Sequence, residues 1–274
     1  MLTNANLLAT VSLPDWLVVV IMGIIEGITE FLPISSTGHL LIAQAWLPAQ
    51  SDVFNIVIQS GAVLAVLFIF KERSVQMLTR WQEPETRDYI LKMGGAFMIT
   101  AVGGLALKAM HFELPETARP VAIALIVGGV LFLWLEKRLI GRQLSDAITW
   151  KIAILIGVGQ LIAAVFPGAS RSGSTIVIAM ALGLSRRAAV EFTFLLGVPT
   201  LLAAGAVKLL DAFKDGAVKE DLGLLLLGTV ISAITAFIAV RWLLGFLQKY
   251  TFVAFGWYRI VLGALVLIIL AGAR

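Results

Sequence analysis

Six apolar segments of 17 to 23 residues constrain the fold of this 274-residue chain more than any other feature. A transmembrane helix needs about 20 apolar residues, because the hydrocarbon core of a bilayer is about 30 Å thick. Only 14% of the residues are charged, whereas soluble domains carry about 25%. The sequence therefore predicts an all-α polytopic membrane protein, with one membrane domain over residues 1–274. The six segments are 54–70, 90–109, 120–136, 190–207, 222–244 and 252–272.

Four further apolar segments come in two pairs, and one segment of each pair, at 8 or 9 residues, is too short to cross a bilayer. Each pair meets at a polar stretch rich in helix breakers, residues 31–39 and 166–175. Non-helical backbone at membrane depth is tolerated only where protein or a wet cavity covers it. We therefore expect two re-entrant helix pairs, and an ordinary eight-helix bundle with proline kinks is the alternative. The short segments are 16–32, 40–47, 152–166 and 176–184.

The two halves of the chain share residues at a nearly constant offset, which indicates an internal repeat over about 15–140 and 150–273. Each half then holds a re-entrant helix pair and three transmembrane helices, and because three is odd, the second half is expected to be inverted. Inverted repeats with broken helices place a binding site where the repeats meet. The matches are Pro33 with Pro167, Gly38 with Gly173, Asn55 with Glu191 and Gly61 with Gly197, at offsets of 134 to 136 residues.

Basic residues gather in loops on one side of this topology, which the positive-inside rule makes cytoplasmic. The opposite loops are acidic or mixed, so both termini are expected outside the cytoplasm. The basic loop residues are Lys71, Arg73, Arg80, Arg87, Lys92, Lys137, Arg138, Arg142, Lys151, Arg186, Arg187, Arg241 and Lys249. The opposite loops hold Glu113, Glu116, Asp211, Lys214, Asp215, Lys219, Glu220 and Asp221.

Composition excludes several other classes. The net charge of +4 is accounted for by these loops and needs no nucleic acid. The absence of cysteine excludes disulfides and cysteine-based metal sites or nucleophiles. The start of the chain has no basic region before its apolar stretch, so we expect no removable signal peptide.

Four charged residues, Glu26, Glu30, Arg171 and Glu191, lie in apolar surroundings, and His39 is close by. Each charge costs about 2.5–3.5 kcal/mol at the centre of a membrane helix. We therefore expect these groups to be paired, to bind a metal or to line a cavity. The alternative is a set of ion pairs that only fix helix packing, most of all for Glu191. The other histidine, His111, is expected at the surface of an external loop.

Glu26 and Glu30 are four residues apart and share one helix face. Two carboxylates repel each other, and a hard divalent cation with oxygen ligands would relieve the repulsion. Together with Arg171 they sum to a charge of −1, and a diphosphate would add about two to three negative charges. We therefore expect Mg²⁺ or Ca²⁺ at Glu26 and Glu30.

Both breaks place hydroxyl residues before a short helix. Helix N-termini bind phosphate through free N–H groups and the helix dipole, and the planar fork of Arg171 suits phosphate oxygens. Simple N-capping is the alternative explanation, but two such stretches in matching repeat positions favour phosphate binding. The hydroxyl residues expected to bind phosphate are Ser35, Thr37, Ser170, Ser172 and Thr175.

These two stretches carry a family resemblance. Residues 26–39, EGITEFLPISSTGH, resemble the first signature of the bacitracin-resistance type undecaprenyl pyrophosphate phosphatases, residues 167–175, PGASRSGST, resemble the second, and residues 191–196, EFTFLL, resemble the segment that follows. The similarity covers essentially the whole chain. Type 2 phosphatidic acid phosphatases are excluded, because they need a second histidine where this chain has Val177.

The resemblance implies a metal-dependent phosphatase of the bacterial plasma membrane that converts undecaprenyl diphosphate to the monophosphate carrier for cell-wall synthesis. It also implies bacitracin resistance and a polyprenyl diphosphate substrate. A lipid flippase or transporter is the alternative, and the sequence leaves a homodimer open. The family's functional residues fall on Glu26, Glu30, Ser36, His39, Ser170, Arg171 and Thr175.

The nucleophile stays open between Ser36, His39 and an activated water. In one arrangement Glu30 takes the proton of Ser36 and His39 donates a proton to the leaving phosphate. In another His39 is the base, or attacks phosphorus itself, and Ser36 orients the phosphate. A serine needs a base within hydrogen-bond reach, and Glu30 and His39 flank Ser36 on either side. The expected catalytic residues are thus Ser36, Glu30, His39 and Arg171.

Overall fold

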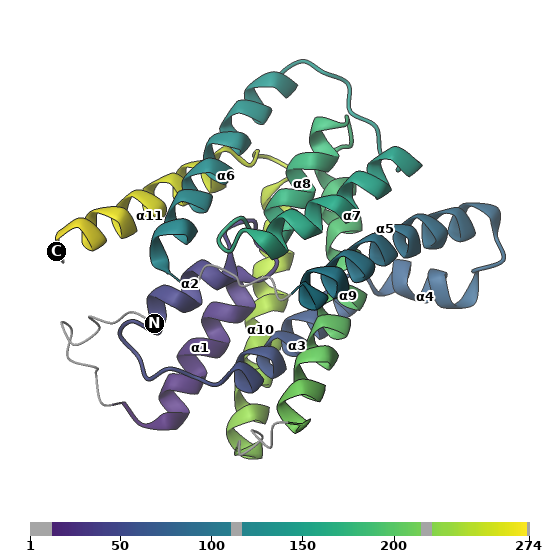
Figure 1. Ribbon diagram of the computed structural model, residues 1–274. Coiled ribbons are helices and arrows are strands. Elements are labelled where there is room, and N and C mark those ends of the chain that lie inside the picture. Colours follow the sequence, from purple (N-terminus) through teal and green to yellow (C-terminus); the bar gives the residue numbers. More distant parts are fainter. Residues whose placement is uncertain (1–12, 111–116, 215–220, 273–274) are drawn as a thin grey trace.

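The computed structural model describes residues 13–110, 117–214 and 221–272. Over these ranges the chain forms eleven α-helices and no β-strand (Figure 1). The all-α prediction is therefore confirmed. The helices are α1 (Asp15–Thr29), α2 (Ser36–Ala43), α3 (Asp52–Ile69), α4 (Lys71–Thr79), α5 (Pro84–Ala109), α6 (Ala118–Leu139), α7 (Trp150–Val165), α8 (Arg171–Ala181), α9 (Arg186–Lys214), α10 (Leu222–Phe246) and α11 (Val253–Gly272).

Six of these helices, α3, α5, α6, α9, α10 and α11, are long and apolar enough to cross a membrane. They coincide with the six predicted transmembrane segments, so the prediction of a polytopic membrane protein is confirmed. Large apolar side chains such as Val102 and Leu226 are exposed on these helices. Apolar side chains on the outer faces of membrane helices contact lipid at no cost, which explains an exposure that water would disfavour.

Two pairs of shorter helices flank the breaks that the sequence predicts. The return helices α2 and α8 have 8 and 11 residues, so at 1.5 Å per residue they extend only about 12 and 17 Å. Each contacts the helix before it, α2 against α1 and α8 against α7. Neither return helix is long enough to cross a bilayer, which agrees with the predicted re-entrant pairs rather than with an eight-helix bundle.

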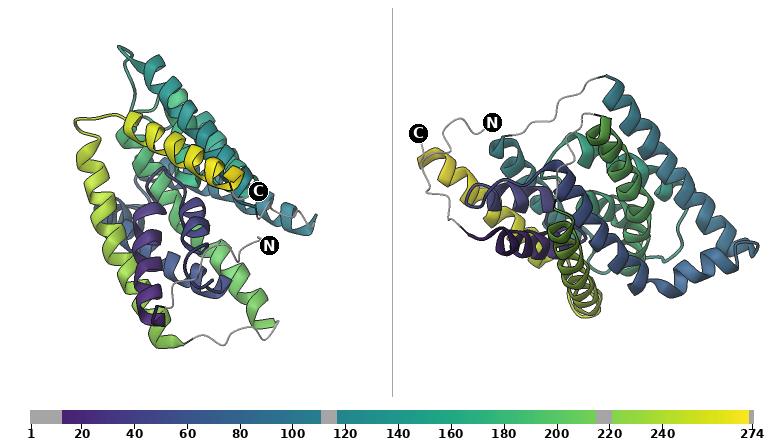
Figure 2. Two further views of the ribbon diagram at one scale, coloured as in Figure 1. Left: turned by 90° about the vertical axis from the view of Figure 1, so that its left-hand side faces the viewer. Right: turned by 90° about the horizontal axis from the view of Figure 1, so that it is seen from below.

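The two halves of the chain interlock. Helix α1 packs against α10, while α7, the counterpart of α1 in the predicted repeat, packs against α5, the counterpart of α10. Helices α6 and α11 also lie side by side (Figures 1 and 2). Each of these contacts joins one half of the chain to the other. The inverted orientation of the second half remains a prediction.

Helix α4 was not expected from the apolar pattern. It is short and polar, begins directly after α3 and contains no buried residue. A search for apolar segments cannot find such a helix, since its only apolar side chains are Val75, Met77 and Leu78.

The predicted cytoplasmic loops come together at one end of the molecule. Arg73, Lys92 and Arg187, from two different loops, line a polar cavity of about 610 Å³. Nearby, Arg186 at the start of α9 forms a salt bridge with the buried Glu136 of α6. The charge pattern thus corresponds to a real face of the protein, and its assignment to the cytoplasm remains a prediction.

Candidate active site

Both return helices begin at a serine with a strained backbone. Ser35 and Ser170 have φ angles of 75° and 68°, and they are the only non-glycine residues with positive φ in the part of the chain that the structure describes. Such conformations cost about 1–3 kcal/mol each and gather at functional sites. The hydroxyl oxygen of Ser35 accepts a hydrogen bond from Gly38 N at 3.3 Å, and that of Ser170 accepts one from Gly173 N at 3.1 Å. Both serines are therefore N-caps, in matching positions of the repeat.

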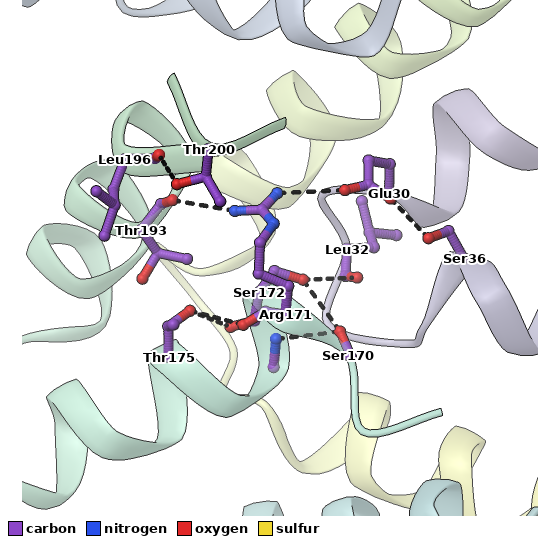
Figure 3. A network of polar contacts seen from close by, with 11 residues as sticks. Glu30, Leu32, Ser36, Ser170, Arg171, Ser172, Thr175, Thr193, Leu196 and Thr200 are labelled. Atoms are coloured by element: carbon purple, nitrogen blue, oxygen red, sulfur yellow. Dashed lines mark hydrogen bonds and ion pairs between the residues drawn. The ribbon is translucent and has the colours of Figure 1, made fainter. Parts of the chain in front are cut away.

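The two breaks meet at Glu30, which is 7% exposed (Figure 3). The Ser36 hydroxyl donates to Oε2 of Glu30 at 2.6 Å, and Nη2 of Arg171 donates to Oε1 at 3.3 Å. A second guanidinium nitrogen, Nη1, donates to the carbonyl oxygen of Thr193 at 3.4 Å, and the guanidinium carbon lies 5.3 Å from the ring centre of Phe31. The structure thus joins three of the four predicted catalytic residues.

This polar group closes one end of a cavity of about 690 Å³. The cavity continues between α5, α7 and α9 along apolar side chains, and it ends near a salt bridge of 2.5 Å between Nζ of Lys108 and Oδ2 of Asp211. The polar lining at the first end comprises Glu30, Ser35, Ser36, Thr37, Ser170 and Arg171. The apolar walls include Phe97, Leu105, Leu161, Leu201 and Val207. The arrangement suits a ligand with a charged head and an apolar tail.

Glu26 lies one helical turn before Glu30 and is only 1% exposed. Its Oε1 is buried without a hydrogen-bond partner in the described residues, and the Gln59 side chain of α3 is near its carboxyl. A buried carboxylate oxygen without a partner is costly, so the site suits a bound cation or a proton. The described residues hold no group of three or more histidines and acidic residues that could form a metal site. A cation at Glu26 and Glu30 would therefore need further ligands from hydroxyls, water or substrate.

His39 is oriented toward α11 rather than toward Glu30. Its Nδ1 lies 2.7 Å from the carbonyl oxygen of Ser35, and its Nε2 lies 2.6 Å from the Tyr258 hydroxyl. Because a carbonyl can only accept, Nδ1 carries a proton, and in a neutral ring Nε2 accepts from Tyr258. The two rings also stack, with centroids 5.6 Å apart. His39 thus lies on the same helix as Ser36, α2, but within the described residues it forms no hydrogen bond with Ser36 or Glu30.

Two hydroxyls that we expected to bind phosphate already have protein partners. The Ser172 hydroxyl donates to the carbonyl of Leu32 at 3.2 Å, and the Thr175 hydroxyl donates to the carbonyl of Arg171 at 2.8 Å. Both side chains are buried. Ser172 thereby links the two breaks. A phosphate role for these two residues remains a prediction, whereas Ser35, Thr37 and Ser170 line the cavity.

Glu191 does not join the other intramembrane charges. It accepts a 2.9 Å salt bridge from Nε of Arg73 and lines the second, polar cavity. This contact agrees with the alternative in which Glu191 is part of a packing ion pair. His111 lies outside the described residues.

A comparison with models of known protein families shows to which family this chain belongs. The model described as bacitracin resistance protein BacA matches residues 19–265. The chain belongs to the BacA family. Among its relatives, an undecaprenyl-diphosphatase of Rhizobium etli is 52% identical over 255 residues, which are 92% of this chain and 96% of that protein. An undecaprenyl-diphosphatase of Xanthomonas axonopodis pv. citri is 48% identical over 261 residues, which are 94% of this chain and 98% of that protein.

One buried charge of this BacA family member was missed in the sequence analysis. Arg259 of α11 is fully buried and donates to backbone carbonyls beside both breaks. The signal was present, because Arg259 is a charged residue inside the predicted segment 252–272. Its presence changes the charge count of the region: two guanidiniums balance the carboxylates of Glu26 and Glu30, so the protein groups sum to zero rather than to −1.

Proposed function

We propose that this chain is an integral membrane phosphatase that converts undecaprenyl diphosphate to undecaprenyl phosphate and inorganic phosphate. Membership of the BacA family and the names of its relatives support this activity. The observation that carries the proposal is the contact of the Ser36 hydroxyl with Glu30, beside Arg171, at the polar end of the cavity.

The shape of the cavity supports a lipid diphosphate as substrate. The N-termini of α2 and α8 and the guanidinium of Arg171 offer donors for phosphate oxygens at one end. Nε of Arg171 is buried without a partner in the described residues, which leaves it available for an anion. The polyprenyl chain would follow the apolar walls, for example past Leu161 and Leu201.

The geometry favours Ser36 as the nucleophile. In the proposed reaction the Ser36 oxygen attacks the terminal phosphorus and Glu30 takes the hydroxyl proton. The phosphoanhydride bond breaks, and the lipid monophosphate leaves with the bridging oxygen and with the proton that Glu30 took from Ser36, so that Glu30 is a free base again. A water molecule then attacks the phosphoserine, Glu30 accepts a proton from that water, and phosphate leaves with the proton returned to Ser36. Direct attack by a water that Glu30 activates is the alternative. His39 is less suited, because Tyr258 and the Ser35 carbonyl occupy its ring nitrogens.

We further propose that Glu26 and Glu30 hold a divalent cation, Mg²⁺ or Ca²⁺. When bound, the cation would offset the negative charge of the diphosphate. The protein groups alone are neutral in sum, and a bound diphosphate would leave the site negative. Glu26 Oε1, which is buried without a hydrogen-bond partner among the described residues, supports this assignment.

The activity would serve the recycling of the lipid carrier for cell-wall synthesis in the bacterial plasma membrane. Because bacitracin sequesters the diphosphate, turnover of the diphosphate would also confer resistance to bacitracin.

Phosphate release from undecaprenyl diphosphate by the detergent-purified protein tests the proposal. We expect turnover that needs Ser36 and Glu30 and yields one phosphate per lipid. Movement of labelled lipid across vesicles without any phosphate release would instead support the flippase alternative.

A further inference from the structure

Arg259 is the largest fully buried side chain of the described residues. Its guanidinium contacts five backbone carbonyls in three separate parts of the chain. Nη1 donates to Pro33 at 3.1 Å, while Nη2 donates to Gly168 at 3.1 Å and to Ala169 at 3.0 Å. The remaining contacts are to Ala124 and Leu125 of α6, both at 3.3 Å.

Three of the five carbonyls that Arg259 contacts lie in the breaks, where they have no helical partners. A break at membrane depth frees carbonyl groups that no water can satisfy, and neighbouring elements must supply donors. Pro33 belongs to the first break, and Gly168 and Ala169 belong to the second. One side chain from the last helix thus satisfies both breaks at once.

These carbonyls lie close in sequence to the residues of the proposed site. Pro33 precedes the strained Ser35 by two residues, and Ala169 directly precedes the strained Ser170. Each strained serine starts the helix that carries a site residue, Ser36 in α2 and Arg171 in α8. A displacement of either carbonyl would therefore move Ser36 or Arg171 relative to Glu30.

We propose that Arg259 is a positioning residue for phosphate transfer, which joins the two breaks so that Ser36 and Arg171 meet at Glu30. The proposal rests on the proposed function. Arg259 does not line the cavity in the described part of the chain, so it acts through the backbone and not by contact with the substrate.

Two glycines next to Arg259 leave space for its guanidinium. A Cβ at Gly128 of α6 would lie 2.2 Å from Nη2 and 2.7 Å from the guanidinium carbon, and a Cβ at Gly173 of α8 would lie 3.1 Å from Nη1. Small residues at both positions leave room for the fork. A lysine has three donors on one atom, so it cannot reach carbonyls on α6 and on both breaks together.

The first test replaces Arg259 by lysine in the full-length protein, which keeps the charge. We expect kcat per folded molecule to fall by about 10- to 100-fold, because small misplacements of reacting groups cost up to about 100-fold. The matched control is Arg186→Lys, which changes the salt bridge with Glu136, and neither of these residues lines the cavity in the described part of the chain. Its kcat should stay within about 3-fold of wild type, the spread expected for a packing change that leaves the reacting groups in place.

A double-mutant cycle separates positioning from a loss of folded protein. If Arg259 acts by positioning Arg171, then Arg259→Lys should lower kcat by less than about 3-fold in an Arg171→Lys background, because the effects of substitutions at coupled residues are not additive. Fully additive losses, or wild-type kcat in folded Arg259→Lys, would overturn the proposal.

A second variant leaves the arginine in place. Gly128→Ala should displace the guanidinium and lower kcat by about 10-fold or more, since the displaced fork can no longer hold both breaks. The control is Gly94→Ala, where the structure shows no atom within 4 Å of an added Cβ. If Arg259→Lys does not fold, the comparison of Gly128→Ala with Gly94→Ala tests the positioning role instead. Wild-type kcat in Gly128→Ala would contradict the proposal.

Failure of the proposed function would look different. A wild-type protein without turnover would overturn the phosphatase, and the variants would then be compared by their affinity for undecaprenyl diphosphate. In that case weaker binding by Arg259→Lys but not by Arg186→Lys supports the positioning role, and equal affinities contradict it.

Discussion

Ser36, the first residue of α2, donates a 2.6 Å hydrogen bond to Oε2 of Glu30, the C-cap residue of α1. The two residues are six positions apart, and in one continuous helix such residues do not face each other. The break between α1 and α2 is therefore what brings the hydroxyl to the carboxylate. The strained backbone of Ser35 lies within this turn. The turn therefore costs conformational energy, but it allows a contact between Ser36 and Glu30 that a regular helix could not make.

Removal of the Ser36 hydroxyl is the most direct test of this contact. If Ser36 attacks phosphorus, Ser36→Ala should retain less than about 1% of wild-type kcat, since general-base-assisted attack is worth about 100-fold or more. Initial rates of phosphate release from undecaprenyl diphosphate measure the loss. Ser60→Ala is a suitable control, because the one hydrogen bond of the Ser60 hydroxyl within the described residues goes to a carbonyl of its own helix.

The same assay distinguishes the other candidates. Substantial turnover by Ser36→Ala together with an inactive His39→Ala would contradict the assignment to Ser36 and support His39. Substantial turnover by both variants with an inactive Glu30→Gln would instead point to an activated water.

Arg171→Lys should lower kcat at least about 100-fold, which corresponds to about 2.7–4 kcal/mol for the loss of one preorganised donor. The lysine keeps the charge, but it loses the planar fork that contacts both Glu30 and Thr193. Steady-state kinetics with folded protein provide the measurement. Wild-type turnover by the lysine variant would mean that Arg171 only fixes packing.

The sequence predicted the part of the site that depends on local pattern. Breakers between short apolar segments located both breaks, because helical backbone cannot pass through such stretches. Charges in apolar surroundings identified Glu30 and Arg171, which the structure joins across 141 positions. The cost of a charge in lipid makes such residues conspicuous in any membrane sequence.

Contacts that depend on how distant helices pack could not be predicted. Nothing in the sequence pairs His39 with Tyr258, or Glu191 with Arg73, since these contacts join residues 219 and 118 positions apart. The hydroxyls of Ser172 and Thr175 look like those of Ser170 in the sequence, yet the turn of α8 directs them to backbone carbonyls. Only the three-dimensional arrangement separates the hydroxyl residues that line the cavity from those that do not.

Gly197 of α9 gives Arg171 its space, and this predicts the effect of one added methyl group. A Cβ at this position would lie 2.4 Å from Nη1 and 2.8 Å from the guanidinium carbon of Arg171. The guanidinium is the far end of a flexible side chain, so Gly197→Ala should move it and leave the fold intact. We expect kcat to fall by about 10-fold or more, as for other misplaced groups.

Thermal stability should remain close to that of wild type in the Gly197→Ala variant. Gly94→Ala again supplies the control, as a helical glycine with open space around it. A variant with unchanged kcat would show that Arg171 tolerates displacement, and a variant that unfolds would show that Gly197 serves packing.

Removal of divalent cations should abolish phosphate release, and Mg²⁺ or Ca²⁺ should restore it. The reason is charge: the protein groups of the site balance one another, and a diphosphate adds about two to three negative charges. Titration of the purified protein with chelator and then with each metal measures the effect. Glu26→Gln should raise the metal concentration needed for half-maximal activity, and full activity in excess chelator would contradict the cation proposal.

The orientation of the protein in the membrane is the last prediction, and it determines on which side phosphate is released. The positive-inside rule places the end of the molecule with Arg73 and Arg187 in the cytoplasm. The opposite end, where Lys108 and Asp211 line the cavity, would then lie outside, so this end of the cavity would face outward. The chain has no cysteine, and single cysteines can therefore be labelled with a membrane-impermeant maleimide in whole cells. Ala49→Cys, in the exposed loop before α3, should react from outside, whereas the exposed Arg142→Cys should react only after the membrane is opened. Labelling of Arg142→Cys in intact cells, with Ala49→Cys protected, would reverse the orientation and place phosphate release in the cytoplasm.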